Sequence, residues 1–129
     1  MNYYISKAVE GGFEDVVERT KTALQSEGFG VLTEINVQET FNQKLGVEFR
    51  PYIILGACNP KLALAALERE DKIGVMLPCN VVIQETGHVV EVAAVNPVTS
   101  IGAVGSDDLR ATAEDVKQRL ERVVSAICA

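Results

Sequence analysis

The C-terminal segment of this chain carries the sequence pattern that most constrains the fold. From Asp107 onward, apolar side chains follow one another at alternating steps of four and three residues: Leu109, Ala113, Val116, Leu120, Val123 and Ile127. Steps of this size place every one of these side chains on the same face of an α-helix. The pattern predicts a helix of about five turns, and a one-sided helix of this length needs a sheet or other helices to cover it.

Two further helices are predicted upstream, and a third segment is ambiguous. Phe13, Val16, Val17, Thr20 and Leu24 have helical spacing up to Gly28, a residue that suits a left-handed helix end. Asn59-Pro60 combines a strong N-cap with a residue preorganised for the first helical position, so a helix is expected over 60–70. Residues 37–45 fit a short amphipathic helix ended by glycine, with an irregular excursion as the alternative.

The remaining apolar stretches favour strands. β-branched and aromatic residues, or short continuous apolar runs, predict five extended segments: 3–9, 29–36, 52–58, 74–85 and 88–95. Thr86-Gly87 joins the last two in the manner of a tight hairpin, and 96–105 is expected to be a loop. Because hairpin and helix connections alternate, we expect an α+β fold with a mainly antiparallel sheet and helices packed on one face.

Composition limits the class of protein. A chain of 129 residues with 47% hydrophobic side chains can close one core, so a single domain over 1–129 is expected. The net charge is -6 and the basic residues are scattered, which disfavours nucleic acid as a partner. The chain shows neither an export signal nor a stretch of about 18 apolar residues, so no membrane partner is expected. Few cysteines, in an odd number, indicate reduced thiols and a cytoplasmic location.

The chemically suggestive residues form two Cys-Asn pairs. Cys58-Asn59 lies at the end of a predicted strand, and Cys79-Asn80 follows Pro78 after one intervening helix. A cysteine just before a helix N-terminus lies where amide groups and the helix dipole stabilise a thiolate. The alternative is that these residues have only structural roles, because free cysteine is among the most buried residue types and asparagine commonly caps helices.

Other chemistry has less support. Two thiols and one histidine make an incomplete zinc site, so we expect no metal. The glycines of 102–105 match no phosphate-binding motif, so no nucleotide cofactor is expected. His88 is adjacent to the predicted hairpin turn and is expected to be solvated, while Cys128 lies at the chain end and carries little functional weight.

Two segments also resemble a known family. KLGVEFRPYIILGACNPKLALAALE and IGVMLPCNVVIQE are similar to the bacterial and archaeal family called domain of unknown function 302. The resemblance implies a β-α-β(4)-α-like arrangement, grouped with TATA-binding-protein-like folds and often found as a homodimer. It implies no established activity. The characteristic positions of the family correspond here to Gly56, Cys58, Asn59, Pro60, Pro78, Cys79 and Asn80.

Three hypotheses follow. The leading one is a small homodimeric binding module with a small-molecule cleft lined by Cys58, Asn59, Cys79 and Asn80, because two amides among apolar groups suffice to fix a ligand. The alternative is a thiol-based redox enzyme or sensor that uses Cys58 with Cys79 as resolving thiol. A third is a structural subunit whose apolar helix face completes a larger assembly.

Overall fold

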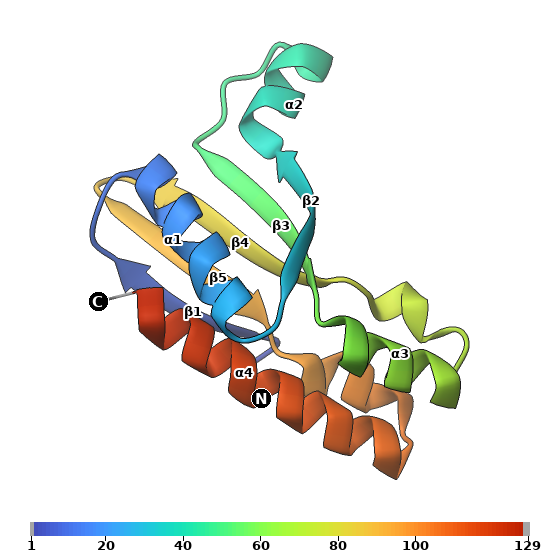
Figure 1. Ribbon diagram of the computed structural model, residues 1–129. Coiled ribbons are helices and arrows are strands. Elements are labelled where there is room, and N and C mark those ends of the chain that lie inside the picture. The colour runs from blue at the N-terminus through green and yellow to red at the C-terminus, as the bar shows by residue number, and fades with distance from the viewer. Residues whose placement is uncertain (1, 128–129) are drawn as a thin grey trace.

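The computed structural model describes residues 2–127, which form a five-stranded sheet with four α-helices and three short 3-10 helices (Figure 1). The strands and α-helices occur in this order: β1 (Tyr4–Val9), α1 (Phe13–Ser26), β2 (Gly30–Asn36), α2 (Val37–Leu45), β3 (Tyr52–Cys58), α3 (Pro60–Arg69), β4 (Cys79–Thr86), β5 (Val89–Val95) and α4 (Asp107–Ile127). The 3-10 helices are η1 (Ile73–Met76), η2 (Pro97–Thr99) and η3 (Ile101–Val104). The predicted α+β class is confirmed.

The sheet is antiparallel throughout. Its strand order is β1-β5-β4-β3-β2. Strands β2, β3 and β4 each pair with the next strand in the chain, and β1 pairs with β5 at the edge of the sheet. Without α2 and α3, the elements follow the β-α-β(4)-α order that the family resemblance implies.

Helices α1 and α4 lie on one face of this sheet (Figure 1). The main core forms between them and the sheet, and the sheet contributes alternate residues such as Leu55, Val81 and Val92, all fully buried. The predicted C-terminal helix is confirmed, and its six periodic apolar residues are all buried. Burial of apolar surface on this scale is the main source of folded-state stability.

A second, smaller cluster lies beyond the end of the sheet. It joins α3, η1 and η3 to the first turns of α4 through five buried residues: Ala66, Ile73, Ile101, Leu109 and Ala113. Because α4 contributes to both clusters, this one helix connects the sheet core to the α3 region.

Residues 36–51, which we call the arm, stand away from this body. β2 and β3 carry α2 at their far ends, at a distance from α1 and α4 (Figure 1). α2 has no buried residue, whereas each of the other α-helices has at least one. The ambiguous segment is therefore a helix, capped by Asn36 and ended by Gly46 in the left-handed conformation.

Three sequence expectations need correction in detail. The strand expected from residue 74 begins at Cys79, because η1 and the cis Leu77-Pro78 peptide occupy the residues before it. The hairpin turn is formed by Gly87-His88, since Thr86 pairs with Val89. The expected loop over 96–105 contains η2 and η3, capped in part by the buried Asn96, whose side chain accepts from Val98 N at 3.1 Å.

Candidate functional site

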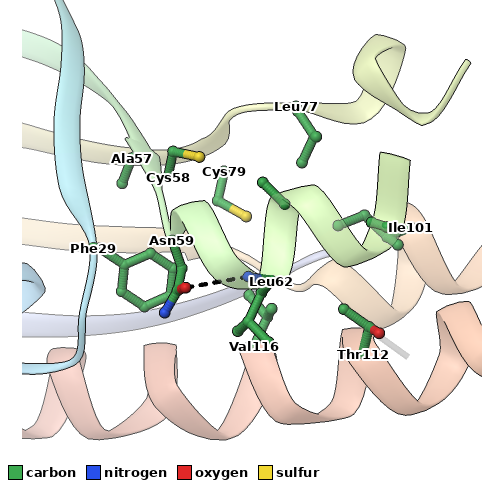
Figure 2. A pocket seen from close by; sticks show the side chains of 12 residues that line it. Phe29, Ala57, Cys58, Asn59, Leu62, Leu77, Cys79, Ile101, Thr112 and Val116 are labelled. Carbon is green, nitrogen blue, oxygen red and sulfur yellow. Dashed lines mark hydrogen bonds between the residues drawn. The ribbon is translucent and has the colours of Figure 1, made fainter. Parts of the chain in front are cut away.

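The two cysteines lie where one strand ends and the next begins. β3 ends at Cys58 and β4 begins at Cys79, and Ala57 lies directly opposite Cys79 in the antiparallel ladder. Both cysteines line one small cavity, near the first turn of α3 (Figure 2). Both are free thiols; Cys79 is buried and Cys58 half-buried.

Asn59 lines the same cavity but already has a structural role. Its Oδ1 accepts a hydrogen bond from Leu62 N at 3.3 Å, which makes it the N-cap of α3, and Pro60 occupies the first helical turn (Figure 2). Its Nδ2 faces the turn at Gly28, where a Cβ would lie 3.0 Å from that nitrogen. The side chain thus connects α3 to the turn between α1 and β2.

The cavity beside the cysteines is too small for an organic ligand. Its volume is about 20 Å³, and apolar residues that include Phe29, Leu62 and Val116 form much of its wall. A cavity needs roughly 10–15 Å³ to hold one water molecule, so the space admits a water or a molecule of similar size.

Burial changes the chemistry of Cys79. Loss of solvation disfavours the thiolate and raises its pKa from 9.0 to about 11, and the neighbouring Cys58 adds to the rise. At neutral pH the Cys79 thiol therefore keeps its proton and is a poor nucleophile.

Asn80 lies on the opposite face of the sheet from Cys79. Successive residues of a strand point to opposite faces, so Cys79 enters the core while Asn80 is exposed. It lines a much larger hollow than the one beside the cysteines. The structure thus brings together three of the four residues in the predicted site and separates the fourth.

This hollow, which we call the sheet hollow, opens on the face away from α1 and α4. Its volume is about 440 Å³, within the range of roughly 300–1,000 Å³ that ligand pockets occupy. Half-buried Val82 and Ala93, opposite each other on β4 and β5, line its middle. Tyrosines and polar side chains line its ends: Tyr3, Tyr4, Tyr52, Asn80, Gln84 and Glu91.

A polar row crosses one end of the sheet hollow. Arg50 Nε donates to Gln84 Oε1 at 2.8 Å, and Gln84 Nε2 donates to Glu91 Oε1 at 2.9 Å. Tyr52, opposite Gln84 in the ladder, lies under the Arg50 guanidinium, whose carbon is 5.6 Å from the centre of the Tyr52 ring. Each member of the row therefore fixes the orientation of the next.

Gln84 and Glu91 were not predicted as site residues from the sequence. Glu91 is a polar residue between two apolar neighbours of its strand, and Gln84 follows the apolar run of the preceding strand. This alternation of apolar and polar residues is the only sequence signal that marks them. Their pairing depends on the turn being Gly87-His88, which sets Gln84 opposite Glu91.

Two other motif residues have steric roles. A Cβ on Gly56 would overlap Thr33 Oγ1 and lie 2.8 Å from Pro78 Cγ. β2, β3 and the residue before β4 therefore approach each other so closely at this point that only glycine fits. His88 lies exposed in the hairpin turn, and residues 2–127 contain no group of three side chains that could hold a metal ion. Cys128 falls outside the described residues.

Comparisons with known proteins agree with this architecture. The family model described as domain of unknown function DUF302 matches residues 5–127. The crystal structure of the uncharacterized conserved protein DUF302 from Bacillus stearothermophilus superposes with a TM-score of 0.91, at 29% identity over 98% of each chain. None of the curated proteins compared is significantly similar. Within residues 2–127, no helix is long and apolar enough to cross a membrane. The chain therefore belongs to the DUF302 family.

Proposed function

We propose that this protein is a homodimeric binding module that takes up a small molecule in the sheet hollow. The observation that carries the proposal is the composition of the hollow, in which Val82 and Ala93 form an apolar floor between polar and aromatic ends; its volume of about 440 Å³ leaves room for a small molecule, whereas the roughly 20 Å³ beside the cysteines does not. An apolar floor with a few fixed polar groups at its ends is the usual composition of a ligand site. Asn80, one of the residues selected from the sequence, belongs to this site.

The uncharged dye Nile red, whose fluorescence rises in apolar surroundings, tests the hollow without knowledge of the natural ligand. We expect enhanced fluorescence with the wild type and its loss in Ala93→Trp, because the indole fills the floor of the hollow. Ala111→Trp on the exposed surface of α4 is the matched control and should leave the signal unchanged. Equal signals from all three proteins would contradict the proposed site.

The arm supports the homodimer. It presents exposed apolar side chains, Leu45 at 68% and Val47 at 47% exposure, on a nine-residue helix with no buried residue. Helices of this length are marginal in water without tertiary packing. The arm contains Glu39, Lys44, Glu48 and Arg50 and is neutral overall in a chain of net charge -6, so a second copy meets no net repulsion there.

Sedimentation velocity over a range of concentrations tests this part separately. We expect the wild type to dimerise and Leu45→Glu/Val47→Glu to remain monomeric, because both charges would be buried in the interface. Val75→Glu changes an equally apolar side chain, 83% exposed on η1 outside the arm, and should leave the dimer intact. A wild type that stays monomeric at all concentrations would remove the dimer from the proposal.

A second candidate function is a thiol switch in a reducing compartment such as the cytosol. The observation that favours it is that Cys58 and Cys79 line one cavity of water-like size. Cys58 is the attacking sulfur because it is half-buried, whereas Cys79 is buried and protonated at neutral pH. With a peroxide as oxidant, Cys58 takes one oxygen to become a sulfenic acid and releases water; the Cys79 thiol then displaces a second water and a disulfide forms.

Mass spectrometry after peroxide treatment distinguishes this switch from inert core cysteines. A disulfide between residues 58 and 79 corresponds to the loss of two hydrogens and is prevented in Cys79→Ala, which should stop at the sulfenic acid of Cys58. An unchanged mass of the folded wild type under the same treatment would exclude the switch.

A further inference from the structure

The chemistry of the sheet hollow selects the class of its ligand, an inference that rests on the proposed binding function. We infer that the hollow takes an organic ammonium ion with an apolar or aromatic body. Three observations lead to this assignment: the hydrogen bonding of the Glu91 carboxylate, the apolar floor beside it and the aromatic residues at the other end of the hollow.

Glu91 carries the negative charge of the hollow. Its Oε1 accepts from Gln84, and within residues 2–127 its Oε2 has no hydrogen-bond partner. The Gln84 amide is uncharged, and the hydrogen bond from Arg50 to its Oε1 holds its Nε2 toward Glu91. A carboxylate oxygen therefore remains available to accept a hydrogen bond from a ligand cation.

Arg50, the only basic side chain in the polar row, is connected to Glu91 only through the Gln84 amide. Arg50 contacts Gln84 on β4 and stacks on Phe49 at 4.4 Å from the ring centre, on the β3 side. Neighbouring strands are about 4.8 Å apart, so one strand separates the guanidinium side from the carboxylate on β5. The overall charge of -6 also attracts cations and repels anions.

The rest of the hollow fits an apolar body attached to that cation. Val82 and Ala93 form the floor, and the hollow extends along β5 from Glu91 to Val95, a span of about 14 Å at 3.4 Å per residue. Tyr4, opposite Val95 in the ladder, and Tyr3 line the far end, where their rings pack edge to face at 5.0 Å. Aromatic rings of this kind bind the apolar or aromatic part of a ligand.

A matched pair of probes tests the charge alone. 2-Phenylethylammonium and 2-phenylethanol have nearly the same size and shape, and only the first is cationic. We expect the cation to displace Nile red from the wild type, and to shift the amide NMR signals of β4 and β5, at a concentration about fivefold lower than the alcohol requires. The difference should shrink in high salt.

Glu91→Gln should abolish this preference, while both probes still bind through the apolar floor. Glu114→Gln removes the same charge from an exposed position on α4 and should preserve it. Equal displacement by the two probes in the wild type would overturn the cation assignment and leave the binding module standing. Displacement by neither probe, with Ala93→Trp abolishing dimerisation, would show that a second copy occupies the hollow and would also overturn it.

Discussion

At Gly56 three segments of the chain meet with no room for a side chain. A Cβ there would overlap Thr33 Oγ1 on β2 and lie 2.8 Å from Pro78 Cγ. We expect Gly56→Ala to lower the free energy of unfolding by about 1–3 kcal/mol, because overpacking forces the neighbours to shift. Gly30→Ala is the control, since a Cβ at Gly30 meets nothing within 4 Å. Urea unfolding measures both, and equal effects would contradict the steric role.

Cys79 links stability to alkaline pH. Burial raises its pKa from 9.0 to about 11, so the folded state holds the proton more tightly than the unfolded chain does. The protonated Cys79 thiol therefore contributes to the free energy of unfolding, on the order of 2 kcal/mol. The contribution is fully present below pH 9 and is lost as the pH rises to about 11.

The measurement compares pH dependence rather than absolute stability. Between pH 8 and 11 the free energy of unfolding should fall more steeply for the wild type than for Cys79→Ala, in which this titration is absent. Comparison of slopes removes the constant cost of the smaller side chain. Identical slopes would contradict a buried, protonated Cys79.

At the scale of the element, α3 depends on its N-cap because little of the helix is buried. It buries only Ala66, and Asn59 supplies the N-terminal hydrogen bond to Leu62 N. We expect Asn59→Ala to cost about 1 kcal/mol and to speed amide exchange in the first turn of α3. Asn59→Asp keeps the acceptor oxygen and should recover most of the loss. Failure of the aspartate to do so would assign the loss to the contact with the Gly28 turn instead.

At the scale of the whole molecule, α4 decides whether the two hydrophobic clusters behave as one unit. Leu109 belongs to the small cluster and Leu120 to the main core, and both are almost fully buried. We propose that residues 2–127 unfold as one domain, so Leu109→Ala and Leu120→Ala should each shift the same single transition by about 2–5 kcal/mol. Leu64→Ala, at a residue 59% exposed, is the control and should have little effect. A separate early transition in Leu109→Ala alone would indicate that the α3 region unfolds independently.

Local patterns determined most of the secondary structure. The alternating steps from Leu109 to Ile127, the Asn59-Pro60 helix start and the glycine at position 46 each act through neighbours within about four residues. Interactions of such short range are visible in the sequence, and each of these elements was predicted from it, the helix before Gly46 with an irregular excursion as the alternative. Residues 74–78 were assigned wrongly to a strand, because a 3-10 turn and a cis proline leave no periodic signal.

The candidate site depended on tertiary structure. Cys79 and Asn80 are consecutive, yet one enters the core and the other the sheet hollow, because side chains alternate across a strand that begins at Cys79. Cys58 and Asn59 stay together because the strand ends between them and a helix begins. Thus the sequence by itself determined the elements and their caps. Only the three-dimensional structure decided that the Gly87-His88 turn sets Gln84 opposite Glu91, and that α1 and α4 pack on one face of the sheet and leave the other open, because strand register and helix packing depend on contacts between elements.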